Sequence, residues 1–246
     1  MSKFLKYLDD CFPKVCGVQV VGAWEQKRKT KPENYCWRCG ITMPSQGITE
    51  MGCAFCKNKK FNWDGCYRLG NYQKPLKDWI WQLKYHKEGI WGNYFGRILG
   101  QHISSHQRFE KEQPRIVCPV PLHFIHRFAR GFNQAKEIGN GLAKGIGCDC
   151  VDLLKRHRKT KKQATLRNLK ERKENVRGAF KSRGANVTGS SIYLVDDVKT
   201  TGATINECAK ILRQMGAMKI YAVVVATAEP RARDSPNAEN PIPQKD

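Results

Sequence analysis

The sequence predicts an α/β fold in which helices flank a parallel sheet, with a small four-cysteine module on its N-terminal side. Between residues 71 and 228, short apolar runs alternate with segments whose apolar residues recur at helical spacing. Residues 32–70 are rich in Cys and Gly and poor in aliphatic side chains, which indicates a separate module. The two ends differ from both. Residues 1–31 are amphipathic and then charged, and the proline-rich residues 229–246 are expected to be disordered.

Helices and strands alternate through the α/β region. Apolar residues at helical spacing predict helices over residues 76–83, 94–99, 135–146 and 203–215. Apolar runs predict strands over residues 115–120, 151–154, 191–195 and 220–226. This alternating order predicts βαβ units with parallel strands. The connection in such a unit is right-handed.

Length and composition exclude several classes of protein. The chain has 246 residues, of which 40% are hydrophobic, so it can bury a core and is not wholly disordered. Its apolar runs are shorter than the about 18 residues of a transmembrane helix, and its start lacks the apolar core of a signal peptide. We therefore expect a cytoplasmic protein without a membrane span. In a reducing compartment, paired cysteines are more often metal ligands than disulfides.

The charge of the chain indicates a polyanionic partner. Lys and Arg number 44 against 22 Asp and Glu, which gives a net charge of +22. Nucleic acid is the simplest partner for such a charge, and a solvated basic surface without a partner is the alternative.

The segment from Val195 to Thr204 has the pattern of a phosphate-binding loop. Two carboxylates, Asp196 and Asp197, end a buried strand, and a Thr-Thr-Gly-Ala-Thr turn then begins a helix. Ligands bind at the carboxyl ends of parallel strands, and the start of a helix offers free backbone N–H groups to a phosphate. Gly202 allows a close approach of the backbone, and the threonine hydroxyls add donors.

Together, these groups predict a site for a ribose 5-phosphate. The carboxylates would accept hydrogen bonds from the sugar hydroxyls and could steady a Mg²⁺ bound to the sugar. The alternative is that they end a strand and cap a helix without a ligand. The candidate site residues are Asp196, Asp197, Thr200, Thr201, Gly202, Ala203 and Thr204.

This loop resembles the phosphoribosyl-pyrophosphate (PRPP) loop of the type I phosphoribosyltransferases. Further blocks resemble the ComF family (ComFC-like and GntX-like proteins) of that superfamily, in the family's order, over residues 36–228. These blocks are Trp79 to Tyr85, Pro119 to His123, Arg127 to Ala135, Gln163 to Leu166 and Glu174 to Phe180.

The resemblance implies that residues 71–228 form a phosphoribosyltransferase-like domain that binds PRPP with Mg²⁺. Asp196 and Asp197 would contact the ribose and are the candidate catalytic groups, and Thr200 to Thr204 would hold the 5-phosphate. The turn at Pro121 would form the pyrophosphate loop. Arg127 and Arg130 would pair with pyrophosphate oxygens, plain surface charge being the alternative. The reaction would transfer ribose 5-phosphate with loss of pyrophosphate, to an acceptor that the residues do not identify.

The four-cysteine module predicts one structural zinc ion. Cys36 and Cys39 form one pair, and Cys53 and Cys56 form a second pair after 13 residues. Two such pairs fill a tetrahedral site, which leaves no open position for catalysis. Four buried or redox-active thiols are the alternative. Many relatives carry a further CxxC pair beginning near Cys16, but Gln19 stands at the partner position here, so a second zinc is not expected.

Residues 155–183 form a basic stretch with thirteen Lys and Arg against two Glu, half of the net charge of the chain. In a type I phosphoribosyltransferase, this stretch would include the loop that covers the active site and attracts PRPP. It could equally track a nucleic-acid backbone, with Lys159, Lys161 and Lys162 as contacts, or be solvated without a function.

Two functions remain at this point. The first is a cytoplasmic ComF-like protein that binds PRPP and acts in natural competence, where it would handle single-stranded DNA with other competence or recombination proteins. The second is a non-catalytic nucleic-acid-binding adaptor that keeps the PRPP loop for folding or regulation.

Overall fold

The computed structural model describes residues 34–85, 89–105, 115–122, 131–158 and 169–229. These residues belong, apart from Asn34, to the unit that spans residues 35–246. The expected N-terminal segment and nearly all of the expected proline-rich tail lie outside the described residues. None of the described helices combines the length and the apolar character that crossing a bilayer requires.

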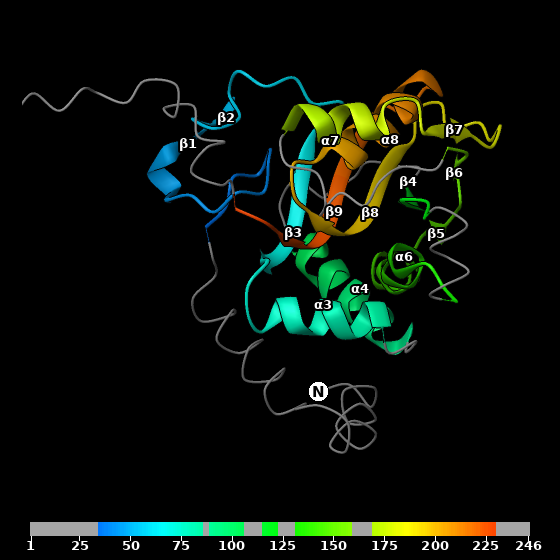
Figure 1. Ribbon diagram of the computed structural model, residues 1–246, viewed down its shortest axis with the longest axis horizontal. Coiled ribbons are helices and arrows are strands. Elements are labelled where there is room, and N and C mark those ends of the chain that lie inside the picture. Colours follow the sequence, from blue (N-terminus) through cyan, green and yellow to red (C-terminus); the bar gives the residue numbers. More distant parts are fainter. Residues whose placement is uncertain (1–33, 86–88, 106–114, 123–130, 159–168, 230–246) are drawn as a thin grey trace, which may run out of the picture. The chain divides into compact units, whose positions relative to one another are not determined.

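A parallel sheet of five strands forms the centre of the molecule, with the strand order β3-β9-β8-β4-β5 (Figure 1). All four strand pairs are parallel, as predicted. The two central strands consist largely of buried apolar residues, because helices cover both faces of the sheet. The strands are β3 (Gly65–Asn71), β4 (Arg115–Pro119), β5 (Asp149–Cys150), β8 (Ser191–Lys199) and β9 (Lys219–Thr227).

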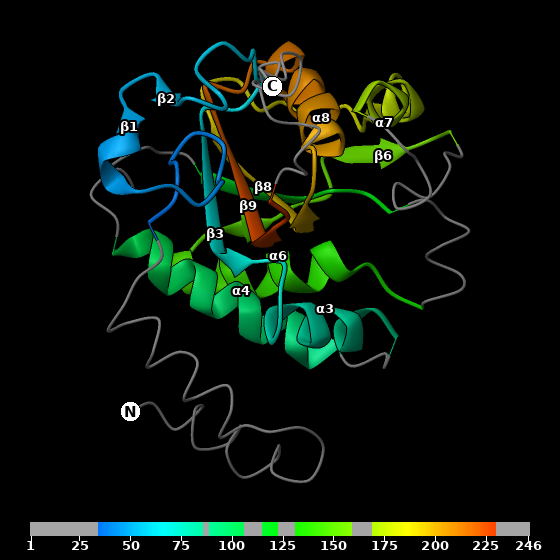
Figure 2. The same cartoon turned by 60° about the vertical axis from the view of Figure 1, so that its left-hand side comes forward.

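Helices pack against both faces of this sheet (Figures 1 and 2). On one face lie α3 (Leu76–Tyr85), α4 (Gly89–Ser104) and α6 (Gln134–Ile146), and on the other lie α7 (Leu169–Val176) and α8 (Ala203–Gln214). The predicted helices are therefore confirmed. Gly147 ends α6 in a left-handed conformation with φ 66°.

Helices α4 and α6 approach so closely that their contact requires glycine. A Cβ atom on Gly96 would lie 2.1 Å from the carbonyl oxygen of Ile138, and one on Gly141 would lie 2.1 Å from that of Asn93. Asn133 caps the start of α6 by accepting from the Ala135 amide, and its Nδ2 donates to the Val120 carbonyl at 3.1 Å. Helix α6 is thus fixed to the carboxyl end of β4.

Two further strands form a separate antiparallel sheet. Strands β6 (Leu154–Arg156) and β7 (Phe180–Ser182) pair with each other, and α7 lies between them in sequence. The predicted strand over residues 151–154 is wrong in its bounds. The chain leaves the main sheet after Cys150, where the Val151 amide makes a last bond to the Val117 carbonyl, and becomes a strand again at Leu154.

The four-cysteine module is built around its own small core. A short hairpin joins β1 (Ile48–Thr49) to β2 (Gly52–Cys53), after the 3₁₀ turn η1 (Ser45–Gly47). The sequence assigns residues up to 70 to the module, whereas β3 lies in the main sheet. Buried Arg68 of β3 links the two parts, since it donates to Thr42 Oγ1 at 2.7 Å and to Thr227 Oγ1 at 2.5 Å.

Candidate functional site

The candidate site begins where β8 continues past β4 at the carboxyl edge of the sheet. Pairing between β4 and β8 ends at Pro119 and Val195, followed by one bond from the Val120 amide to the Val195 carbonyl. Strand β8 then runs on to Lys199 and, among the described strands, pairs there with β9 alone. The two aspartates therefore lie within the strand instead of after it, on the part that has lost its β4 neighbour. Ligands of open parallel sheets bind in such a crevice.

A cavity of about 300 Å³ lies at this position. It brings together most of the predicted PRPP residues: Asp196, Asp197, Thr200, Gly202, Ala203 and Thr204. Further groups that the sequence analysis did not assign to the site also line it, namely Tyr72, Lys84, Arg172 and Lys199. Of these, Lys84 stood within a block of family resemblance, whereas Tyr72 and Arg172 are brought in by the fold from distant segments.

Each aspartate side chain is oriented by the backbone that follows it. The Asp197 amide donates to Asp196 Oδ1 at 2.9 Å, and the Val198 amide donates to Asp197 Oδ1 at 2.6 Å. The second oxygen of Asp197 lies 2.7 Å from Lys84 Nζ, at the end of α3. Lys84 therefore brings a positive charge into the predicted ribose site from α3, which lies on the other face of the sheet from α8.

The surroundings of Asp196 favour its neutral form. Burial, followed by the nearby charge of Asp197, raises the pKa of Asp196 to about 7, against the opposing charges of Lys84 and Arg156. Burial disfavours the charged form of Lys84, but the charge and hydrogen bond of Asp197 outweigh burial and raise its pKa. Asp196 can thus take up or release a proton near neutral pH, which is common at functional sites.

The predicted phosphate-binding loop has the backbone form expected of it. Gly202 adopts φ 78° and ψ 6°, a left-handed conformation that glycine adopts without strain, and α8 begins at Ala203. Thr201 Oγ1 accepts from the Ala203 amide at 3.3 Å, and the first helical bond runs from the Asn206 amide to the Gly202 carbonyl at 2.8 Å. The amides at the start of this helix are the groups that suit a phosphate.

The predicted pyrophosphate turn lies at a neighbouring cavity. Pro121 lines a space of about 410 Å³ together with the start of α6, with Lys155 and Arg156 of β6, and with Arg183, which follows β7. Arg127 and Arg130 lie outside the described residues, as do Lys159, Lys161 and Lys162 of the basic stretch.

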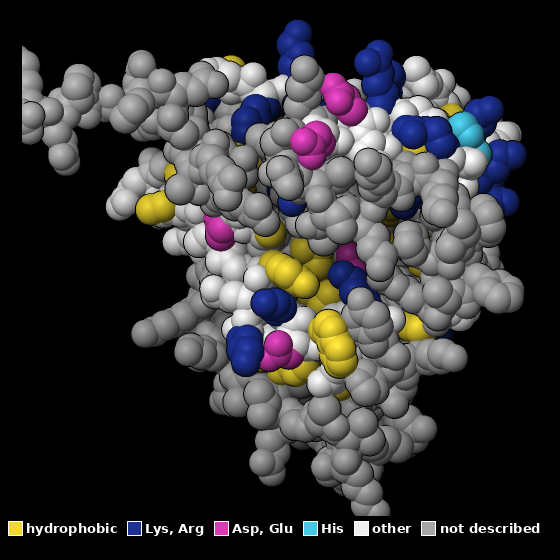
Figure 3. Space-filling model, viewed as in Figure 1, with side chains coloured by type: hydrophobic (Ala, Val, Ile, Leu, Met, Phe, Trp, Pro, Cys, Tyr) yellow, Lys and Arg dark blue, Asp and Glu magenta, His cyan; other side chains and the backbone are white. Residues whose placement is uncertain are grey.

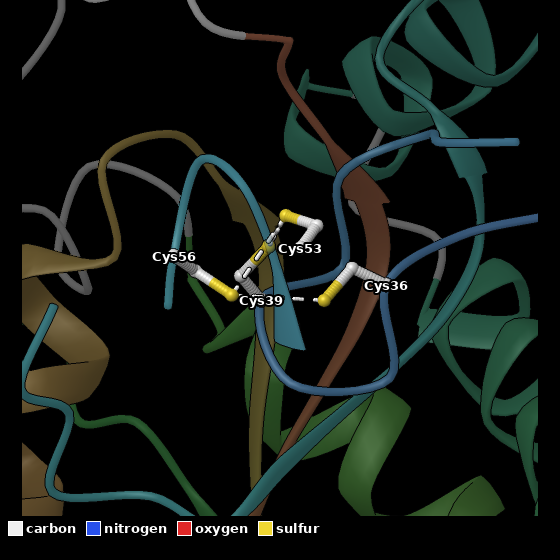
Figure 4. A group of neighbouring side chains, drawn as sticks. All are labelled: Cys36, Cys39, Cys53 and Cys56. Atoms are coloured by element: carbon white, nitrogen blue, oxygen red, sulfur yellow. Dashed lines mark hydrogen bonds between the residues drawn. The ribbon is translucent and has the colours of Figure 1, made fainter. Parts of the chain in front are cut away.

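The four cysteines of the module form a set that can hold one metal ion (Figure 4). Their side chains are buried and turn toward one another, with all sulfur atoms within 4.8 Å. Sγ–Sγ distances are 3.7 Å for Cys36 and Cys56, 3.6 Å for Cys39 and Cys53, and 3.8 Å for Cys53 and Cys56. A tetrahedral site with metal–sulfur bonds of about 2.3 Å has edges of about 3.8 Å. The spacing fits such a site and is too long for a disulfide.

Glycines at the two cysteine turns are required by space as well as by conformation. Gly40 has φ 75°, and a Cβ atom there would lie 2.7 Å from the sulfur of Cys66. Gly52 has φ 98°, and a Cβ atom would lie 2.5 Å from the sulfur of Cys56. Cys66 itself lies beneath the first turn and outside the ligand set, and burial raises its pKa to about 11.

Lys and Arg side chains gather over α7, β6 and β7, along the upper right edge of the molecule (Figure 3). Lys155, Lys173, Arg177, Lys181 and Arg183 are all exposed there. The described part of the predicted basic stretch is therefore a positively charged surface next to both cavities.

Comparisons with known proteins agree with this geometry. The family model described as "Phosphoribosyl transferase domain" matches residues 129–240. "Competence protein F" of Haemophilus influenzae is 28% identical over 206 residues, which cover 82% of this chain and 88% of that protein. "DNA utilization protein YhgH" of Salmonella typhimurium is 30% identical over 187 residues, covering 75% and 80%.

A third relative has a related name. "Competence protein ComFC" of Streptococcus pneumoniae is 29% identical over 149 residues, which cover 61% of this chain and 62% of that protein. The matches and the parallel sheet with its acidic pair and helix-start loop lead to one conclusion. The chain belongs to the ComF family, whose α/β domain is of the type I phosphoribosyltransferase kind.

Proposed function

We propose that this ComF-family protein binds PRPP in the cavity between β8 and α8 and acts in natural competence. The observation that carries the proposal is the composition of that cavity: an acidic pair on one wall and a helix-start loop on the other. A phosphorylated sugar is a ligand that needs both, because its hydroxyls donate to carboxylates and its phosphate accepts from amides.

In this arrangement, the vicinal hydroxyls of the ribose would donate to Asp196 and Asp197, and the 5-phosphate would lie against the amides from Thr200 to Thr204. Lys84 neutralises Asp197 in the absence of ligand. Lys199 is buried and lines the phosphate end of the cavity, where its charge would favour the anion. The turn at Pro121 and the arginines Arg127 and Arg130 would serve the pyrophosphate.

The site also suits phosphoribosyl transfer. The bond between ribose C1 and pyrophosphate would break, and a bond from C1 to a nucleophilic acceptor would form. Asp196, with a pKa of about 7, would take the proton that the acceptor loses. The oxygen donors of the acidic pair fit Mg²⁺, which would neutralise charge on the leaving pyrophosphate when bound.

We assign zinc to the four-cysteine set. Thiolate ligands select soft or borderline metals, and a closed four-sulfur tetrahedron is typical of structural zinc. With every ligand position supplied by the protein, the ion would stabilise the module, whose buried core consists of the four cysteines and Ile41.

A role in DNA handling is supported by the relatives' names, by the net charge of +22 and by the exposed basic surface over α7 and β6–β7. Single-stranded DNA is the form of nucleic acid we propose for this surface, with Lys159, Lys161 and Lys162 as contacts and other competence or recombination proteins as partners. A non-catalytic adaptor that keeps the PRPP loop for folding or regulation is not favoured, because the relatives carry competence-related names and the chain matches a phosphoribosyl transferase domain.

Replacing both aspartates, Asp196→Asn with Asp197→Asn, is expected to weaken PRPP binding at least about a hundredfold, since two charge-assisted hydrogen bonds are lost. Calorimetric titration with PRPP and Mg²⁺ measures this. The matched control is Asp149→Asn, an exposed aspartate outside the cavity, which should keep the wild-type affinity. Unchanged binding in the double variant would place PRPP elsewhere.

The raised pKa of Asp196 predicts a pH dependence of affinity. Hydroxyl groups donate to the ionised carboxylate, so PRPP affinity should fall about tenfold from about pH 8 to about pH 6 through a folded-state pKa of about 7. The ligand titrates too, so the informative quantity is the difference between wild type and Asp196→Asn, whose profile lacks this component. Identical profiles would contradict the assignment.

The raised pKa of Asp196 also predicts that the free energy of unfolding of the ligand-free protein falls as the pH rises. The folded-state pKa of about 7 lies above the ordinary value of about 3.9. Stability from this group is therefore full below about pH 4 and is lost as the pH rises toward about 7. In the absence of ligand, Asp196→Asn should unfold at higher urea concentration than wild type at about pH 8, with little difference at about pH 4.

Binding of single-stranded DNA should weaken steeply as salt rises. Changing Lys159, Lys161 and Lys162 to Gln should reduce the slope of log affinity against log salt by about 2, from three lost phosphate contacts. Fluorescence anisotropy with a labelled oligonucleotide measures the slope. Changing Lys74, Lys77 and Lys144 to Gln, all exposed and outside the basic stretch, is the control. Absence of binding at low salt would remove DNA from the proposal.

A further inference from the structure

Trp63 connects the four-cysteine module to the phosphate-binding loop. Its side chain is only 3% exposed, and its ring lies against Gly202, where a Cβ atom would be 2.9 Å from Trp63 Cη2. Its indole N–H donates to the carbonyl of Arg38 at 2.9 Å. Arg38 stands between Cys36 and Cys39, so one side chain contacts the loop at one end and a metal-binding turn at the other.

The Arg38 side chain fixes this turn to the second cysteine pair. It donates to the Cys56 carbonyl at 2.6 Å and to the Lys59 carbonyl at 2.8 Å. Its guanidinium lies 5.3 Å from the ring centre of Phe61, which stacks on Trp63 with ring centres 4.2 Å apart and planes at 12°. The position of the Trp63 ring therefore depends on both halves of the cysteine set.

A second contact joins the segment around Trp63 to the same loop. The Asn62 amide donates to Asn206 Oδ1 at 2.9 Å, and Asn206 supplies the first helical amide bond, to the Gly202 carbonyl. The segment from Phe61 to Trp63 thus contacts the phosphate-binding loop and the first turn of α8 together.

We propose that Trp63 is a positioning residue that transmits the folded state of the metal-bound cysteine module to the phosphate-binding loop. Loss of the metal would release the Arg38 carbonyl, shift the indole ring and loosen the backbone from Thr200 to Asn206. Affinity for PRPP would then fall although no ligand of the metal touches the sugar phosphate. This last consequence rests on the proposed function, whereas the coupling of module to loop does not.

The test measures hydrogen–deuterium exchange of the amides from Thr200 to Asn206 in the full chain, before and after the metal is removed by a chelator. It compares wild type, Trp63→Phe and Trp91→Phe. Trp91 is an equally buried tryptophan, 3% exposed, that packs against Phe95 in the helical layer on the other face of the sheet. The change Trp91→Phe controls for the loss of stability caused by replacing any buried tryptophan, because Trp91 lies away from the loop.

In wild type and Trp91→Phe, metal removal should speed exchange of these amides about fivefold or more, the factor that one net hydrogen bond contributes. In Trp63→Phe, exchange should already be fast with metal bound, and removal should add less than about twofold, because changes along one chain of contacts are not additive. In PRPP titrations of the same proteins, those whose loop amides exchange faster should bind PRPP more weakly.

Equal loop exchange in metal-bound Trp63→Phe and Trp91→Phe would overturn the proposal. The proposal would also be overturned if metal removal speeds loop exchange by the same factor in Trp63→Phe as in wild type. If the chelator unfolds the whole chain, the comparison of the two metal-bound variants decides by itself. A loop that responds as expected in a protein that binds no PRPP would reject the proposed function and leave the coupling intact.

Discussion

The whole site depends on one difference in strand length. Strand β8 continues past its neighbour β4, whose pairing ends at Pro119, a residue without an amide hydrogen to donate. The free edge of β8 then carries Asp196 and Asp197 into a cavity instead of into the sheet. If β4 were as long as β8, its backbone would lie beside the two aspartates and close this crevice. The position of the acidic pair and the contact of Asp197 with Lys84 both follow from this unpaired strand end.

The two layers and the module meet at this strand end. Helix α3 brings Lys84 from one face of the sheet, and the proposed phosphate-binding loop leads into α8 on the other. The module adds Trp63 beneath Gly202. A change in α3, in α8 or in the four-cysteine module can therefore alter the geometry of the site. The four-cysteine module can hold a metal ion and has a small core, so loss of such an ion would be one way to influence the site from outside.

The sequence predicted the loop because its chemistry lies in ten consecutive residues at the change from strand to helix periodicity. It missed strand β3 because the fully buried Arg68 interrupts the apolar pattern, and the partners that satisfy this charge come from distant segments. It missed α7 because only Leu169 and Val176 are apolar among eight residues. Tyr72 and Arg172 belong to the cavity through tertiary folding alone, which local patterns do not encode.

The most direct test of the account is a crystal structure of the protein with PRPP and Mg²⁺. We predict ribose hydroxyls within hydrogen-bond distance of Asp196 and Asp197, and a 5-phosphate on the amides from Thr200 to Thr204. The Lys84 contact with Asp197, 2.7 Å without ligand, should be rearranged by the sugar. A PRPP molecule bound at another surface, or an empty cavity at saturating ligand, would contradict the central claim.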